Sequence, residues 1–233
     1  MCSVTRNDFN HTFILLLLLF PMPALAIPAI NCHCFTDRSF NAATPAAADP
    51  YFLATTQNSF FATVFNTDKK SIVIKKQQGT SPDDLWIAYW VASKSGTLPE
   101  TLLKTKLENE SWREVLAPLR LTSKALGSRF YNAMDAKLSA ANLAEIVVDE
   151  LLLRHKLLGE VELAAMRQLG ASSQELILAT VIAKKKDRPA RQIYLEVKNG
   201  AKTWGSLLRW ANIDTKNMQQ EISSFLKTHP TQI

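Results

Sequence analysis

The sequence predicts an all-α protein in which two tandem repeats of four to five short helices each follow a signal peptide and an N-terminal arm. Only 7 of the 233 residues are glycine, whereas Ala, Leu and Lys, which lose little rotamer freedom in a helix, are abundant. Helix-capping residues recur along the chain, and no long segment has the strict alternation of a half-buried strand. A capped segment near residue 79 also recurs about 90 residues later, as an internal duplication predicts.

The first 26 residues have the three parts of a secretory signal peptide. Arg6 lies in a short polar start, residues 13–20 are apolar, and Ala24-Leu25-Ala26 has the small-x-small pattern of a cleavage site. This apolar run is too short to span a bilayer, and no later run reaches the roughly 20 apolar residues that a membrane helix needs. We therefore expect an exported chain, periplasmic or extracellular, without a transmembrane helix in its mature part; an uncleaved signal anchor is the alternative.

Residues 27–49 form an arm that holds both cysteines of the mature chain. Cys32, His33 and Cys34 place two thiols and an imidazole side by side, and these groups are ligands for zinc, copper or haem iron. A disulfide between Cys32 and Cys34, or thiol exchange by the pair, is the other interpretation. The chain has no second cysteine pair and no C-x-x-C-H haem-attachment pattern, so we expect no cofactor unless a metal or haem binds at these three residues.

The duplication is clearest in two capped segments. Residues 79–92 align with residues 170–183, with identical residues at five of 14 positions. The register continues with small shifts, so that Trp112 is matched by Trp204. We therefore place helical repeat 1 at residues 50–134 and helical repeat 2 at residues 135–233.

Local signals predict the first helices of repeat 1. A helix from Pro50 to Asn66 can be capped by Asp49, with proline in its first turn. Residues 71–74 are too few for their period to distinguish helix from strand. Gly79 can then end a helix in the left-handed conformation, and Ser81 can cap the next helix.

The same signals continue to the end of the chain. Pro99 and Pro189 suit a first helical turn. A long helix from about Ser139 to Lys156 opens repeat 2, and Gly170 repeats the signal of Gly79. The other predicted caps are Ser, Thr or Asp residues, two of them followed by the Glu of a capping box: Ser111 with Glu114, Thr122, Ser172 with Glu175, Thr203 and Asp214.

Tryptophans supply one set of candidate surface residues. Trp112 and Trp204 directly follow a cap residue in each repeat, where an aromatic side chain anchors the start of a helix in the core. Trp86 and Trp90 lie four residues apart on one helix face and have no counterpart in repeat 2. We therefore expect Trp86 and Trp90 to contribute to an interaction surface.

A basic cluster at the end of a predicted helix supplies the other set: Lys184, Lys185, Lys186 and Arg188. Cations at this position also complement the helix dipole without any ligand. The formal net charge of +6 favours anionic partners such as phospholipid headgroups, acidic glycans or nucleic acid. Short helices joined by tight turns are compatible with a helix-turn-helix, but export argues against a nucleic-acid partner.

Residues 199–205, with the sequence Asn-Gly-Ala-Lys-Thr-Trp-Gly, precede an apolar helical turn. This segment resembles a motif of exported bacterial helical proteins in which a Gly-Lys-x-Trp-Gly segment joins two short helices. The first repeat departs from the motif, since residues 110–113 read Glu-Ser-Trp-Arg and lack the glycines. The resemblance implies no activity and assigns no functional residue.

No catalytic signature is present: the chain lacks G-x-S-x-G, H-E-x-x-H, a phosphate-binding loop and a dinucleotide-binding fingerprint. We therefore expect a non-enzymatic periplasmic or secreted interaction or scaffold protein that binds a protein or an anionic surface. The alternative is a metal-, haem- or thiol-handling protein that uses Cys32, His33 and Cys34.

Overall fold

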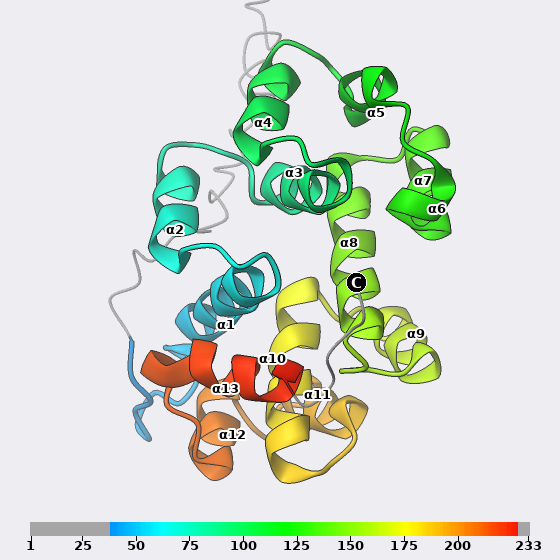
Figure 1. Ribbon diagram of the computed structural model, residues 1–233. Coiled ribbons are helices and arrows are strands. Elements are labelled where there is room, and N and C mark those ends of the chain that lie inside the picture. The colour runs from blue at the N-terminus through cyan, green and yellow to red at the C-terminus, as the bar shows by residue number, and fades with distance from the viewer. Residues whose placement is uncertain (1–37, 228–233) are drawn as a thin grey trace, which may run out of the picture. The chain divides into compact units, whose positions relative to one another are not determined.

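The computed structural model describes residues 38–227, and all regular structure in this range is helical (Figure 1). Thirteen α-helices and two short 3-10 helices, η1 and η2, follow one another along these residues. The predicted all-α class is confirmed. The predicted signal peptide and the segment with Cys32, His33 and Cys34 lie outside the described residues.

The elements of the first part of the chain are α1 (Asp49–Val64), α2 (Lys69–Gln77), α3 (Pro82–Ser95), α4 (Pro99–Leu107), α5 (Trp112–Leu116), η1 (Ala117–Leu119), α6 (Ser123–Leu126) and α7 (Ser128–Asp135). Those of the second part are α8 (Ala140–Arg154), α9 (Glu160–Gln168), α10 (Ser173–Lys186), α11 (Ala190–Lys198), α12 (Trp204–Ala211), η2 (Thr215–Asn217) and α13 (Met218–Lys227). The helices α1 to α4 have 16, 9, 14 and 9 residues, and α8 to α11 have 15, 9, 14 and 9.

Most helix starts follow the predicted cap chemistry. The Ser81 hydroxyl accepts a hydrogen bond from the Asp84 amide at the start of α3, and Ser139 does the same for Asn142 in α8. Complete capping boxes form at Ser111 with Glu114 and at Ser172 with Glu175. Gly79 and Gly170 have φ values of 93° and 86°, in the left-handed region that favours glycine.

Three local details differ from the prediction, and one undecided segment is assigned. Thr122 is the N-cap of α6, but its side chain makes no capping hydrogen bond. Asp49 lies inside the first turn of α1, Ala48 is the N-cap, and no side chain caps this helix. Pro189 is the N-cap of α11, whereas Pro99 does occupy the first turn of α4. Residues 71–74 are helical, because the Asp68 carboxylate accepts a hydrogen bond from the Ser71 amide and thereby caps α2.

The most extensive helix packing joins elements that are distant in the sequence. The first helix, α1, packs against α10 and α13, while α8 packs against α3 (Figure 1). The main contacts of α1 and of α8 therefore cross the repeat boundary predicted after residue 134. None of the described helices is both long and apolar enough to cross a membrane.

Candidate functional site

The structure places Trp86 and Trp90 in the core, with 2% and 1% of their surface exposed. The Trp86 ring lies 4.6 Å from that of Phe61, and the Trp90 indole N–H donates to the Leu126 carbonyl at 3.2 Å. Helix α3 packs against α8 and α4 and meets the rings of α1, and every residue from 85 to 91 is buried, so it has no outward face there. The expectation that Trp86 and Trp90 form a surface is therefore wrong.

Most of the predicted basic cluster already has partners within the chain. Lys185 forms an ion pair with Glu221 at 2.9 Å, and Arg188 forms one with Glu196 at 2.6 Å. The Lys184 ammonium donates to a backbone carbonyl of residue 156 at 3.3 Å. Lys186 differs from these, since its ammonium lies 4.7 Å from the centre of the Trp210 ring. This contact joins the end of α10 to α12.

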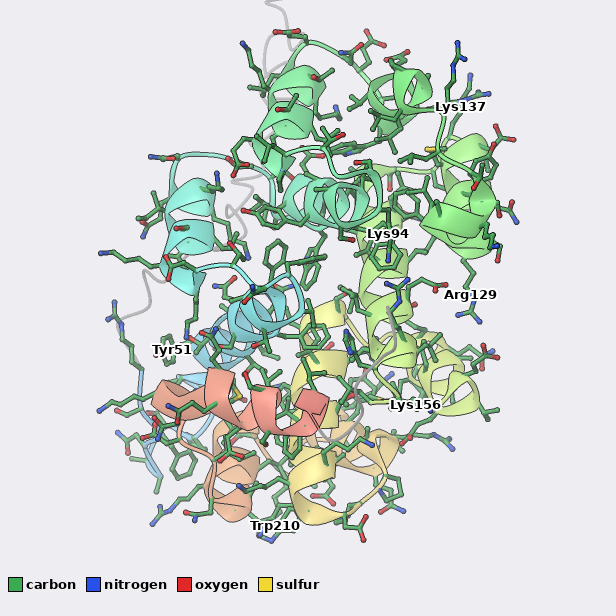
Figure 2. The ribbon with its side chains drawn as sticks, in the orientation of Figure 1. Tyr51, Lys94, Arg129, Lys137, Lys156 and Trp210 are labelled. Carbon is green, nitrogen blue, oxygen red and sulfur yellow. The ribbon has the colours of Figure 1, made fainter. Side chains whose placement is uncertain are left out.

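Trp210 is the exposed tryptophan of the described chain, with 45% of its surface accessible. Its ring lies 5.4 Å from the Arg188 guanidinium carbon in addition to the Lys186 ammonium, so two cations contact one aromatic side chain. Figure 2 shows Trp210 at the outer end of α12, directed away from the neighbouring helices. The apolar residues of α12 that pack inward recur at positions 204, 207, 208 and 211, which leaves position 210 on the opposite face. This periodicity was the signal in the sequence that could have identified Trp210.

A pocket of about 530 Å³ lies between the end of the arm, α1, α12 and η2, and Arg209, which precedes Trp210, lines it. Its basic lining residues are Arg38, Arg209 and Lys216, and the Arg209 guanidinium lies 5.7 Å from the centre of the Phe40 ring. The pocket's one acidic lining residue, Asp214, already accepts a hydrogen bond from the Lys216 amide.

We use the name α12 surface for the residues that this pocket and the Trp210 contacts bring together: Arg38, Phe40, Lys186, Arg188, Arg209, Trp210 and Lys216. Apart from Lys186 and Arg188, these residues are absent from the interaction surface that the sequence predicted.

The carboxylate of Asp49, in the first described helix, fixes the start of α12. The Asp49 carboxylate accepts hydrogen bonds from the amides of Trp204 and Gly205, at 3.0 and 2.8 Å, and so caps α12 across 155 residues. Burial raises the pKa of Asp49, and these two hydrogen bonds oppose that rise. A Cβ atom on Gly205 would lie 2.8 Å from the rings of Phe40 and Phe52, so glycine lets α1 and the arm approach α12 closely.

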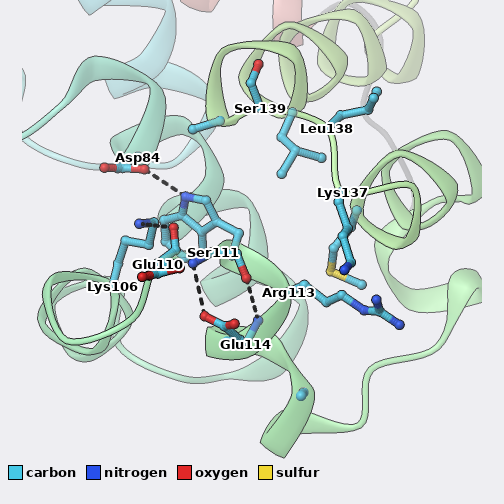
Figure 3. Close-up of a pocket in the computed structure, with 14 residues that line it drawn as sticks. Asp84, Lys106, Glu110, Ser111, Arg113, Glu114, Lys137, Leu138 and Ser139 are labelled. Carbon is cyan, nitrogen blue, oxygen red and sulfur yellow. Dashed lines mark hydrogen bonds between the residues drawn. The ribbon is translucent and has the colours of Figure 1, made fainter.

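A second pocket, of about 730 Å³, lies between α5, α7 and α8 (Figure 3). Its polar side chains are engaged in holding the helix starts around it. The Trp112 indole N–H donates to the Asp84 carboxylate at 2.7 Å, and the Lys106 ammonium donates to two backbone carbonyls at 3.1 Å. Ser111 and Glu114 cap α5 (Figure 3). None of the described residues that line this pocket is a cysteine or a histidine.

A third polar feature is a pair of matched side-chain contacts between consecutive helices. Lys76 on α2 donates to the Asn58 side chain on α1 at 2.7 Å. Arg167 on α9 donates to the Asp149 carboxylate on α8 at 2.7 Å, and both pairs are separated by 18 residues. Burial lowers the pKa of Lys76 to about 8, with Asp83 opposing this shift. Lys76 therefore faces an amide, whereas Arg167 faces a carboxylate at the matching position.

Neither a search for metal ligands nor comparison with known proteins adds a further site. Within residues 38–227, no group of three or more His, Cys, Asp or Glu side chains could hold a metal ion. No protein-family model, no curated protein and no solved structure matches the chain.

Proposed function

We propose that this chain is an exported, non-enzymatic helical binding protein whose α12 surface contacts an anionic partner. Export rests on the signal-peptide pattern of residues 1–26. The observation that carries the proposal is the exposed Trp210 ring with Lys186 and Arg188 against it. Aromatic and arginine side chains are enriched at binding surfaces because they bury a large area and also form polar contacts.

The use of polar side chains elsewhere supports a binding role over catalysis. In the pocket between α5, α7 and α8, Asp84, Ser111 and Glu114 are engaged in hydrogen bonds that fix Trp112 and the start of α5. These side chains therefore maintain the fold. At the α12 surface, by contrast, the cations outnumber the nearby carboxylates Glu196 and Asp214, which leaves a net positive surface.

We also infer that the two parts of the chain descend from one duplicated helical unit. The matching lengths of α1 to α4 and α8 to α11 support this inference, as do the two side-chain pairs separated by 18 residues. The α12 surface would then be a feature of the second unit alone, because α5 has Arg113 where α12 has Gly205.

Binding of poly-L-glutamate, monitored through Trp210, tests the proposal. Trp86, Trp90, Trp112 and Trp204 are buried, so quenching of fluorescence by neutral acrylamide reports mainly on Trp210. We expect poly-L-glutamate to protect Trp210 at low salt and to lose this effect at high salt. An unchanged quenching constant at saturating polymer would contradict the proposal.

The matched variants have the same net charge. Lys186→Glu combined with Arg209→Glu should abolish the protection, since both side chains belong to the α12 surface. Lys104→Glu combined with Lys124→Glu changes exposed residues of α4 and α6 and should retain it. Equal loss in both double variants would show that net charge, and not the α12 surface, governs binding.

A further inference from the structure

We propose that the anionic partner of the α12 surface is a phospholipid bilayer, on which the protein docks peripherally. This inference rests on the proposed function and specifies the class of partner. Its first support is the chemistry of Trp210, which exposes an amphipathic indole with a cation from α10 and another from the following turn against it. Tryptophan is favoured at the headgroup level of membranes, and lysine and arginine are attracted by anionic lipids.

The second support is the distribution of the cations. They come from three separate segments: the end of the arm, the end of α10, and α12 with η2. Their ring contacts form two groups that meet at consecutive residues of α12: Lys186 and Arg188 contact Trp210, and Arg209 contacts Phe40. Cations spread over one surface suit the many phosphates of a membrane.

The third support is the pocket that Arg209 lines. It offers about 530 Å³ and combines the rings of Phe40 and Phe52 with the cations Arg209 and Lys216. A phosphate headgroup can be accommodated beside these cations, while its glycerol and upper acyl carbons contact the rings. Two carboxylates lie nearby: Glu196 pairs with Arg188, and Asp214 accepts the Lys216 amide, so no carboxylate is paired with Arg209 among the contacts described.

A single exposed indole favours peripheral binding over insertion. The neighbouring large apolar residues of α12, Leu207 and Leu208, are buried, so little apolar area is available to enter the acyl region. Binding should therefore depend mainly on charge and weaken steeply as the ionic strength increases.

Sedimentation of the chain with phospholipid vesicles tests the assignment. The probes are phosphatidylcholine vesicles alone and vesicles that contain phosphatidylglycerol in addition. We expect the chain to sediment only with the phosphatidylglycerol vesicles at low salt, with protection of Trp210 from acrylamide. Combining Lys186→Glu with Arg209→Glu should weaken binding about 25-fold or more, since each basic residue near the surface contributes roughly fivefold. The matched Lys104→Glu and Lys124→Glu variant should bind like the wild type.

The outcomes separate this inference from the proposed function. Protection of Trp210 by poly-L-glutamate, with no binding to phosphatidylglycerol vesicles, would overturn the bilayer assignment and leave the proposed function standing. Absence of both effects would overturn both. Equal binding to the two kinds of vesicle, or equal loss in the two double variants, would also contradict a charge-dependent contact through the α12 surface.

Discussion

Replacing Asn58 by Asp would give α1 the carboxylate that α8 already has at position 149. In the wild type, Lys76 is partly buried and donates to the Asn58 amide oxygen, whereas Arg167 donates to a carboxylate at the same distance of 2.7 Å. Burial is the main cause that lowers the Lys76 pKa from 10.5 to about 8. A carboxylate at position 58 should favour the charged ammonium and raise this pKa towards its ordinary value.

The sign and size of the effect follow from proton linkage. Between pH 8 and 10.5 the unfolded chain holds its proton on Lys76 while the folded chain has lost it, so the free energy of unfolding rises with pH. With 1.36 kcal/mol per pKa unit, the rise between pH 7 and pH 10 amounts to about 2.5 kcal/mol. In the Asn58→Asp variant we expect less than about 1 kcal/mol over the same interval.

Urea unfolding followed by circular dichroism at several pH values measures this difference. Partial burial also lowers the pKa of Lys69. This group makes the same contribution to the pH dependence of both proteins, so its effect cancels when they are compared. Asp149→Asn is the matched control, because it leaves Arg167 facing an amide. This substitution should lower the free energy of unfolding by about 2–4 kcal/mol at every pH from 7 to 10, since a guanidinium does not titrate in this range.

The same pH dependence in the wild type and in Asn58→Asp would refute this reasoning. Persistence of the rise in Lys76→Met would also refute it, because no titrating group would then remain at position 76. A loss that varies with pH in Asp149→Asn would show that other groups dominate the titration.

Three further substitutions test the contacts that position the helices, each by its effect on the free energy of unfolding. Gly205→Ala should lower stability by about 1–2 kcal/mol, because the clash with Phe40 and Phe52 outweighs the better helix propensity of alanine; a more stable variant would contradict the close approach. Asp49→Asn should cost about 1–2 kcal/mol through its weakened cap on α12, and unchanged stability would argue against that cap. Thr180→Val should raise stability by about 1 kcal/mol, because the buried Thr180 hydroxyl has no hydrogen-bond partner in the described chain; a loss would reveal a partner.

The sequence predicted those parts of the fold that depend on neighbouring residues. Ser81 and Ser172 cap their helices because each cap needs only an amide three residues further along. The burial of Trp112 and Trp204 follows from the same local pattern, in which an aromatic side chain comes directly after a cap.

A contact between distant residues accounts for one error, and local patterns that were not used account for the others. Asp49 was expected to cap its own helix, but its acceptors serve amides 155 residues away, which no local pattern reveals. Trp86 and Trp90 were expected on a surface because only their spacing was considered. Residues 85–92 are apolar all around the helix, and this composition is typical of a buried helix. Trp210 was missed although the inward periodicity of α12 leaves it outside.

Site-specific photo-crosslinking tests the binding role of the α12 surface most directly. A photoreactive phenylalanine would be placed at Trp210 and, as a control, at Leu107 of α4, where 89% of the surface is exposed. After irradiation in the exported fraction of the source cells, we expect adducts with an anionic partner from position 210 and none from position 107. Adducts from position 107 alone, or equal adducts from both positions, would contradict a binding role for the α12 surface.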